Sequence, residues 1–275
     1  MEVCLKKIPQ YALWGISLHY YTIATGNWGQ KGSSTDFDEK EYFGGVKNAL
    51  YMDTLLKNYT AMMNKYDPVK KIALVVDEWG IWTEVEPGTN PGFLYQQNTM
   101  RDALIAASTL NIFNNHSDRV RMANLAQAIN VLQALILTDK EKMLLTPTYH
   151  IFKMYKVHQE ANLLESSVSV NDYKYGTESI PGVNVSASKG KDGKIHVSVV
   201  NLNPNKAVPA SVILNGYNAK QIKGEILASA SYADYNSFNK PDKIATKEYK
   251  EFKKESDSKI TMKLPPLSIV TLEIE

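Results

Sequence analysis

The sequence predicts two architectures in succession, an α/β part over residues 1–164 and an all-β part over residues 165–275. In the first part, apolar strand-like segments alternate with long amphipathic segments, which is the pattern of βαβ units around a parallel sheet. In the second part, short segments of alternating polarity are separated by turn residues, which is typical of an antiparallel β-sandwich. Three strand–helix units are too few for an eight-stranded barrel of about 250 residues, so we expect the C-terminal part of a (β/α)8 TIM barrel.

Three segments of the α/β part are predicted to be parallel strands: residues 14–21 (WGISLHYY), 71–79 (KIALVVDEW) and 119–127 (RVRMANLAQ). The apolar run Ile72–Val76 shows no alternation, which indicates a strand covered on both faces. It ends at Asp77 and Glu78. Open sheets and barrels place their catalytic groups at the carboxyl ends of such strands.

Helical spacing of apolar residues predicts helices over residues 46–63 and 100–110, and Asp67-Pro68 marks the end of the first. Thr146-Pro147 predicts the start of another helix, because it supplies an N-cap and a proline at the first helical position. A helical turn is also predicted to follow the third strand, from the spacing of Leu125, Ile129, Leu132 and Ile136.

The all-β part contains five short segments that alternate in polarity and are bounded by turn residues. They are residues 193–203, 208–216, 223–229, 259–266 and 268–275. The charged run from Lys247 to Lys259 is predicted to be a solvated strand edge and loop.

Composition narrows the class of protein and the kinds of partner. The 275 residues are 44% hydrophobic and 22% charged, as in a soluble globular protein. A formal net charge of +2 gives no reason to expect nucleic acid or an anionic membrane as a partner. No apolar stretch approaches the roughly 20 residues of a membrane span. The N-terminus lacks the layout of a signal peptide, which favours a cytoplasmic location.

Metal and cofactor chemistry find little support in the sequence. The single cysteine, Cys4, excludes an internal disulfide and a cysteine-based metal site. The chain has no P-loop and no GxGxxG motif, so we expect no nucleotide cofactor. Four histidines show no metal-ligand spacing, and we expect no metal site: His19, His116, His150 and His158.

Polar and aromatic residues gather at the carboxyl ends of the three predicted strands. Period-2 alternation places His19 and Tyr21 on the same side of the first strand. The full set is His19, Tyr21, Glu78, Trp79, Trp82, Asn124 and Gln127. This set of residues contains no Lys or Arg, which suits a neutral polyhydroxylated ligand such as a sugar. Amides bond sugar hydroxyls, and tryptophan covers the apolar faces of sugar rings.

Long motifs of the chain resemble the C-terminal half of glycoside hydrolase family 51, the retaining α-L-arabinofuranosidases. They are ISLHYY (16–21), VVDEWGIW (75–82), EVEPGTNPGFLYQQNTMRDALIA (84–106), DRVRMANLAQAINVLQALI (118–136) and TPTYHIFKMYKVHQ (146–159). Two further motifs resemble that family's C-terminal sandwich: SFNKPDKI (237–244) and LPPLSIVTLEIE (264–275). The resemblance implies barrel strands 6 to 8 in residues 1–164 and a jelly-roll-like sandwich in residues 165–275.

The same resemblance implies roles for five residues. Glu78 matches the catalytic nucleophile at the end of the seventh barrel strand. Tyr21 matches a tyrosine that hydrogen-bonds the nucleophile and holds its orientation, and His19 matches its partner on the sixth strand. Trp82 matches an aromatic residue that lines the sugar pocket, and Gln127 matches a glutamine that bonds the arabinose hydroxyls. We therefore expect His19, Trp82 and Gln127 to bind the substrate.

Retaining hydrolysis requires a second carboxyl group about 5–5.5 Å from the nucleophile, acting as acid and then as base. In this family that group is the Glu of an Asn-Glu pair, and the chain contains no Asn-Glu dipeptide. Glu84 and Glu86 follow Glu78 in the same loop, but the family pattern gives them no acid role. We therefore expect a C-terminal fragment that carries the nucleophile without the acid/base and is inactive alone.

The resemblance implies release of terminal α-L-arabinofuranosyl residues from polysaccharides or oligosaccharides, by a full-length parent that forms homo-oligomers. One alternative keeps hydrolase chemistry but acts on another sugar, as in a neighbouring family of the same barrel clan. A second alternative is a non-catalytic carbohydrate-binding or assembly module that uses aromatic residues of the sandwich: Tyr217, Tyr232, Tyr235 and Phe238.

Overall fold

The three predicted parallel strands are present in the computed structural model, which describes residues 1–275. They are β1 (Gly15–Thr22), β2 (Ala73–Ile81) and β3 (Val120–Leu125). They form one sheet in the order β1-β2-β3, and both pairs are parallel. Their carboxyl ends therefore lie along one edge of the sheet, where the predicted site residues follow.

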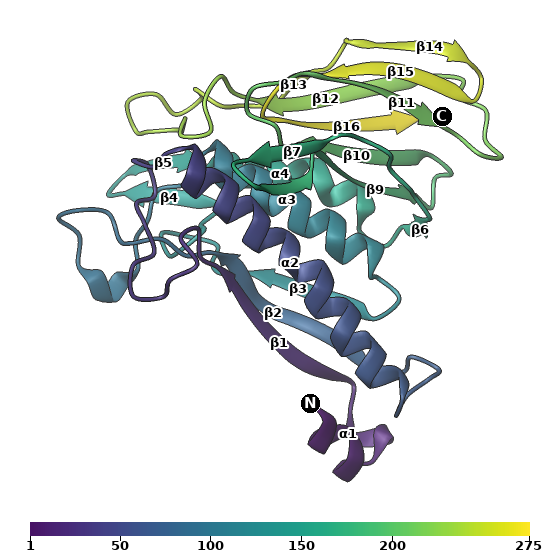
Figure 1. Ribbon diagram of the computed structural model, residues 1–275, viewed down its shortest axis with the longest axis horizontal. Coiled ribbons are helices and arrows are strands. Elements are labelled where there is room, and N and C mark those ends of the chain that lie inside the picture. Colours follow the sequence, from purple (N-terminus) through teal and green to yellow (C-terminus); the bar gives the residue numbers. More distant parts are fainter.

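Helices cover one face of this sheet (Figure 1). Four are α-helices, of which the second and third lie against the sheet: α1 (Glu2–Lys7), α2 (Glu39–Asn64), α3 (Met100–Asn115) and α4 (Pro147–Tyr155). Three further helices are short 3-10 turns: η1 (Gln10–Ala12), η2 (Pro91–Phe93) and η3 (Lys156–His158). Thr146 caps α4 by accepting a hydrogen bond from the Tyr149 amide, and Pro147 takes the first helical position, as predicted.

The second half of the chain forms antiparallel sheets. A six-stranded sheet has the order β13 (Lys247–Glu248), β12 (Ile222–Ala228), β16 (Ser268–Ile274), β10 (Ile195–Asn201), β9 (Val183–Lys189) and β6 (Asn162–Leu164). A three-stranded sheet has the order β11 (Val208–Ile213), β15 (Lys259–Leu264) and β14 (Phe252–Ser256). Two hairpins stand apart: β4 (Ile136–Asp139) with β5 (Lys142–Leu145), and β7 (Asp172–Tyr175) with β8 (Glu178–Pro181).

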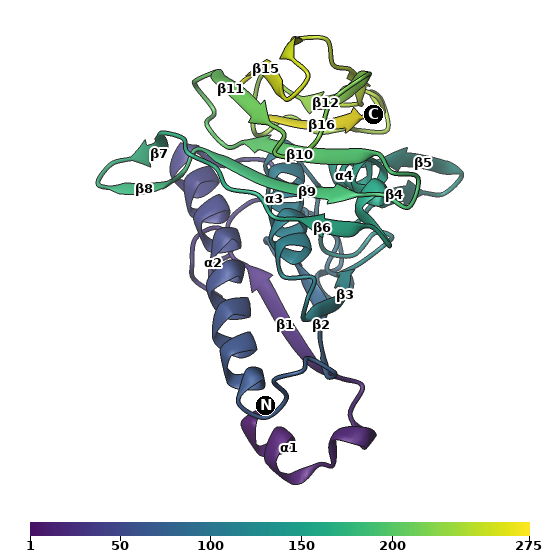
Figure 2. The ribbon, with the colours of Figure 1, turned by 90° about the vertical axis from the view of Figure 1, so that its right-hand side faces the viewer.

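The elements lie in layers (Figures 1 and 2). Helices separate the parallel sheet from the six-stranded sheet, and the three-stranded sheet covers the far side of the latter. One core continues from β2 through α3 to the six-stranded sheet, and includes Leu74, Leu104 and Ile269. A second core lies between the two antiparallel sheets and includes Val199 and Ile260. The five strands predicted in the all-β part are all present, and the jelly-roll connectivity stays a prediction.

The helical turn predicted near Leu125, Ile129, Leu132 and Ile136 is wrong. After β3 the chain forms turns, and Ile136 begins the β4–β5 hairpin. Asn130 and Leu132 have φ values of +59° and +53°. These left-handed conformations are incompatible with a continuous right-handed helix.

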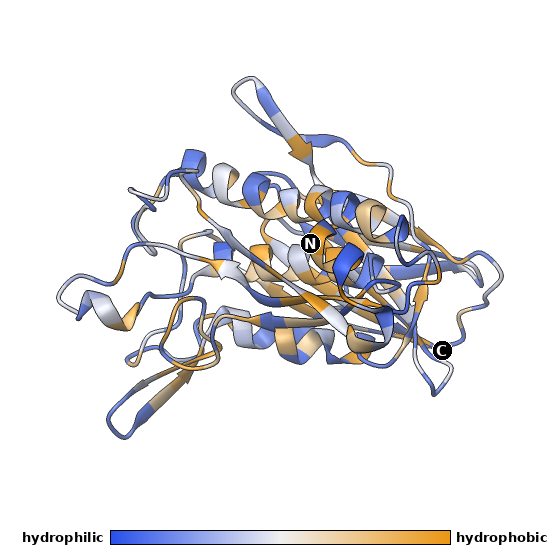
Figure 3. Ribbon diagram, turned by 90° about the horizontal axis from the view of Figure 1, so that it is seen from below, coloured by the Kyte–Doolittle hydropathy of each residue, from blue (hydrophilic) through white to orange (hydrophobic).

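The apolar part of β2 is buried apart from the partly exposed Val75, as expected for a covered strand, but the two neighbouring strands are not covered on both faces. The face opposite the helices is open, and Ser17 and His19 on β1 and Met122 and Asn124 on β3 are exposed there. Polar and apolar stretches are both visible along the chain from below (Figure 3). None of the helices combines the length and the apolar composition that crossing a bilayer requires.

Candidate active site

Three predicted site residues meet at the carboxyl ends of β1 and β2. The Tyr21 hydroxyl donates a hydrogen bond of 2.9 Å to Oε2 of Glu78. His19 Nδ1 lies 3.5 Å from the same oxygen, and its Nε2 lies 3.2 Å from Oδ1 of Asp77. The side chains of Glu78 and His19 are 47% and 48% exposed, so this carboxylate is accessible to a ligand.

A β-bulge in β2 brings two consecutive carboxylates to this site. Between the pairs Ser17–Val75 and His19–Glu78, β2 contains one more residue than β1. It also has one more residue than β3 over the same stretch. Successive side chains of a regular strand point to opposite faces, but here Asp77 and Glu78 both reach His19. Bulges frequently re-aim side chains beside active sites in this way.

The residues after Glu78 anchor the bulge to the core. The Trp79 ring is 1% exposed and contacts Phe113 edge to face, with ring centroids 5.3 Å apart. Gly80 has φ +144°, and a Cβ there would lie 3.2 Å from Gln133 Oε1. That oxygen accepts the Ile81 amide at 2.8 Å. Gln133 is fully buried and was not identified as a supporting residue from the sequence.

Hydrogen bonds and burial shift the pKa values of Asp77 and Tyr21, two titratable groups beside Glu78. Ser17 Oγ donates to Oδ1 of Asp77 at 2.7 Å, and this bond lowers the pKa of the Asp77 carboxyl. Burial, and then the hydrogen bond to Glu78, raise the pKa of Tyr21. Tyr21 therefore stays protonated and keeps its role as a hydrogen-bond donor at neutral pH.

Two tryptophans extend the site beyond the carboxylates. Trp82 contacts Tyr21 and Trp28 in edge-to-face geometry, with ring centroids 5.0 Å and 5.7 Å away. Trp28 is 57% exposed and comes from the Gly/Ser-rich loop after β1. It was missed, although a tryptophan in a loop that follows a site strand is a usable signal. The expectation of a site without cations also needs correction, because Lys31 Nζ lies 5.6 Å from the Trp82 ring centre.

Gln127 and Asn124 do not join the Tyr21–Glu78 contact. Gln127 lies just beyond β3 and is exposed. Its backbone N–H donates to the Val131 carbonyl at 3.1 Å. It lines a groove of about 810 Å³ between the segments that follow β2 and β3. Asn124 is exposed on the open face of β3. Neither side chain forms a hydrogen bond to Glu78.

The other carboxylates of the loop after β2 hold that loop in place. Glu84 Oε1 accepts the Lys31 amide at 2.9 Å. Glu86 Oε1 accepts the Ser34 hydroxyl and, at 3.1 Å, the Gln97 amide. These contacts tie the loop after β2 to the loop after β1. Neither Glu84 nor Glu86 is hydrogen-bonded to Glu78 or to Tyr21.

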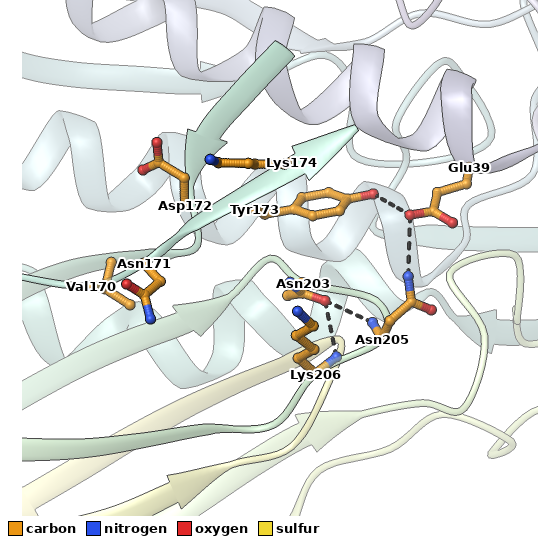
Figure 4. A pocket seen from close by; sticks show the side chains of 9 residues that line it. All are labelled: Glu39, Val170, Asn171, Asp172, Tyr173, Lys174, Asn203, Asn205 and Lys206. Atoms are coloured by element: carbon orange, nitrogen blue, oxygen red, sulfur yellow. Dashed lines mark hydrogen bonds between the residues drawn. The ribbon is translucent and has the colours of Figure 1, made fainter. Parts of the chain in front are cut away.

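Away from these residues, the molecule offers neither a metal site nor a large polar pocket that contains predicted site residues. No group of three or more His, Cys, Asp or Glu side chains is arranged to bind a metal. A separate polar hollow of about 670 Å³ lies at the amino end of α2. In it the Tyr173 hydroxyl and the Asn205 amide both donate to Glu39 Oε1, at 2.8 and 3.2 Å (Figure 4). None of the predicted site residues lines this hollow.

The aromatic residues of the alternative binding-module hypothesis are dispersed. Tyr232 stacks on Tyr42, with ring centroids 4.9 Å apart, and packs against the large core. Tyr217 packs against the core between the antiparallel sheets. Phe238 packs beside the β4–β5 hairpin, and Tyr235 is 36% exposed. These four side chains form no common platform.

Comparisons with known proteins show which family the chain resembles. Residues 77–268 match the family model described as the alpha-L-arabinofuranosidase C-terminal domain. An intracellular exo-alpha-L-arabinofuranosidase of Bacteroides ovatus is 46% identical over 266 residues, which are 95% of this chain and 51% of that protein. The crystal structure of the GH51 arabinofuranosidase from Xanthomonas axonopodis pv. citri superposes with a TM-score of 0.96 at 43% identity, over 100% of this chain and 55% of that one.

More distant structures show the same fold. The family 51 alpha-L-arabinofuranosidase AbfB from Bifidobacterium longum superposes with a TM-score of 0.82 at 19% identity, over 99% of this chain and 55% of that one. The family model, the sequence identity and the fold together place the chain among the glycoside hydrolases. It belongs to glycoside hydrolase family 51, the α-L-arabinofuranosidases, and corresponds to the C-terminal portion of their chains. It spans about half the length of the relatives named here.

Proposed function

We propose that this chain supplies the nucleophile of a retaining α-L-arabinofuranosidase, and that the nucleophile is Glu78. The observation that carries the proposal is the 2.9 Å hydrogen bond from Tyr21 to Glu78 Oε2, at the carboxyl end of a parallel strand. It holds one carboxylate oxygen and leaves Oε1 free to react. The open face of the parallel sheet fits the inner wall of a (β/α)8 barrel, whose other strands would come from outside these residues.

In the first step, Glu78 Oε1 attacks the anomeric carbon of a terminal α-L-arabinofuranosyl unit. The bond from that carbon to the leaving oxygen breaks, and the leaving oxygen takes a proton from a second carboxylic acid. A covalent glycosyl ester on Glu78 results. In the second step the same group, now a carboxylate, takes a proton from water as the water attacks the anomeric carbon. Arabinose leaves with its configuration retained.

The second carboxylic acid is proposed to lie outside residues 1–275. Glu84 and Glu86 are engaged with the loop after β1, which counts against either as the acid. The partner is proposed to be an oligosaccharide or polysaccharide with terminal arabinofuranosyl groups. Aromatic surfaces at Trp82 and Trp28 would cover its apolar faces.

A chimera tests this function. The part of the Bacteroides ovatus relative that this chain does not cover is joined upstream of residue 1. We expect the chimera to hydrolyse an aryl α-L-arabinofuranoside and its Glu78→Gln variant to lose turnover by several orders of magnitude. Glu84→Gln is the matched control and should keep most of the activity. Equal losses in both variants, or none in Glu78→Gln, would contradict the proposal.

A further inference from the structure

The groove that Gln127 lines has walls from two loops on the carboxyl-end side of the parallel sheet. One wall is the loop after β2, with Phe93 and Tyr95, and the other is the segment after β3, with Gln127 and Asn130. The two walls are joined by a 2.9 Å hydrogen bond from the Leu132 amide to the Leu94 carbonyl. Figure 1 shows the β4–β5 hairpin and the loop that contains η2 projecting on the same side of the molecule.

Phe93 is held in solvent by the turn that carries it. It is 70% exposed, which leaves its ring accessible to a ligand. Asn90 caps the turn by accepting the Gly92 amide at 2.9 Å. Leu94 follows with φ +52°, a conformation that non-glycine residues seldom adopt. The backbone of the turn is therefore constrained on both sides of Phe93.

The remaining lining suits a neutral, hydroxyl-rich ligand. Tyr95 and Phe238 add aromatic surface and pack on a small core below the groove. Gln127 offers an exposed amide, and the Asn130 side chain fixes the hairpin through the Thr138 amide at 2.7 Å. The lining contains no Lys or Arg and one carboxylate, Asp139, so an anionic ligand would find no counter-charge.

The groove begins close to the candidate active site along the chain. The Ala126 amide donates to the Trp79 carbonyl at 2.9 Å, and Trp79 directly follows Glu78. Gln127, the next residue, already lines the groove. We propose that this groove binds the glycan to which the terminal arabinofuranosyl unit is attached, with Phe93 as the stacking platform. The proposal rests on the function proposed above, and makes the substrate an oligosaccharide or polymer rather than a small glycoside.

Kinetics of the chimera test the groove. Phe93→Ala should lower kcat/KM on α-1,5-arabinotriose by about three- to tenfold, the size of one aromatic contact, mainly through KM. The aryl arabinofuranoside has no extended glycan, so its kcat/KM should stay unchanged. Tyr11→Ala is the matched control, because Tyr11 is a 94% exposed aromatic in η1, before β1, and should change neither substrate.

An equal loss on both substrates would place Phe93 in the arabinose pocket and overturn the proposal, as would no loss on either. If the chimera has no turnover at all, the proposed function fails, but the groove is still tested by binding. Calorimetric titration of residues 1–275 with arabinotriose then decides. Binding that Phe93→Ala weakens and Glu78→Gln leaves intact supports the groove. Absence of binding, or binding indifferent to Phe93, overturns it.

Discussion

At the scale of single residues, Tyr21 and the β2 bulge determine how Glu78 is presented. The bulge turns the carboxylate toward β1, and the phenol fixes one of its two oxygens. The His19 ring lies beside both Asp77 and Glu78, with one nitrogen toward each carboxylate. The result is a carboxylate held in one orientation, as the role proposed for Glu78 requires.

Removing the Tyr21 hydroxyl should reduce chemistry more than binding. A hydrogen bond to a charged group contributes about 1.5–3 kcal/mol, so Tyr21→Phe in the chimera should lower kcat by about ten- to a hundredfold. KM should change less, because the hydroxyl contacts the nucleophile and not the sugar. Steady-state kinetics on an aryl arabinofuranoside measure this, and a loss confined to KM would mean ordinary substrate binding.

Tyr20→Phe is the matched control for that measurement. Tyr20 is the neighbouring residue on β1, and its hydroxyl donates to the Asn48 carbonyl at 2.6 Å, on the side of the helices. Its loss should cost about 1 kcal/mol of stability and leave kcat unchanged. A similar fall in kcat for both variants would show that Tyr21 acts through folding.

The sequence predicted the meeting of His19, Tyr21 and Glu78 because strand alternation and the shared carboxyl edge of parallel strands determine it. It did not predict the bulge, since a bulge depends on pairing with both neighbouring strands. Trp28 was missed for a related reason. Its contact with Trp82 depends on how the loop after β1 folds over the end of β2.

At the scale of elements, a buried ion pair fixes the entry to β2 and β3. Arg119 Nη1 donates to Asp67 Oδ2 at 2.6 Å, and both side chains are fully buried. Nη2 of the same arginine bonds Asn64 Oδ1 at 2.5 Å, at the end of α2. The contact therefore sets the position of the helix relative to the amino ends of both strands.

Asp67→Asn should leave the Arg119 guanidinium buried without a counter-charge and destabilise the protein by about 3–5 kcal/mol. Lys57→Met is the control, because Lys57 pairs with Asp53 on the surface, and loss of that pair should cost under about 1 kcal/mol. Urea denaturation of residues 1–275 or of the chimera measures both. Equal effects would mean that the buried pair has no special structural role.

A partly buried histidine should make stability depend on pH. His158 lies between the hydroxyls of Ser188 and Ser198, at 2.8 and 2.6 Å, and burial lowers its pKa to about 4. The unfolded chain binds this proton near pH 6.5, so stability should fall as pH drops from about 6.5 to 4, by up to about 3 kcal/mol. Melting temperatures across this range should fall less steeply for His158→Gln. An equally steep fall of the melting temperature in both proteins would show that His158 is not the cause of the pH dependence.

Elements were predictable where one periodicity held over a whole segment, as in β10, β16 and α3. A helical turn was wrongly predicted from Leu125 to Ile136 because the apolar residues there have helical spacing. In the structure they do not lie on one helix face. Ile129 is 52% exposed, whereas Leu132 is 3% exposed in a left-handed conformation. The β7–β8 hairpin was also missed, because each of its strands has only four residues.

At the scale of the whole molecule, the parallel sheet is open on one face and at two edges. β1 and β3 each pair on one side only, and their exposed backbone groups and side chains favour association with other chains. The succession of a parallel sheet with helices and then antiparallel sheets followed from the two textures of the sequence, but their packing against one another through a shared core did not. The open face of the parallel sheet could not be predicted from the sequence. An apolar strand shows that it should be covered, but not which segment of the chain or which other chain covers it.

Residues 1–275 alone should show no measurable arabinofuranosidase activity. General acid catalysis is typically worth 10²–10⁴-fold, and the walls that would orient the sugar are absent from the open face. The assay uses an aryl arabinofuranoside and compares the chain with its Glu78→Ala variant. Turnover that depends on Glu78 would show that an acid exists within these residues, and Glu84 and Glu86 would be examined first.

The central claim is that Glu78 is the nucleophile, and azide rescue tests it most directly. In the chimera with Glu78→Ala, azide can occupy the space of the lost carboxylate and attack the anomeric carbon in its place. We expect partial recovery of activity on an aryl α-L-arabinofuranoside and a glycosyl azide of inverted configuration, identified by NMR. A glycosyl azide of retained configuration would assign Glu78 the acid/base role and contradict the account.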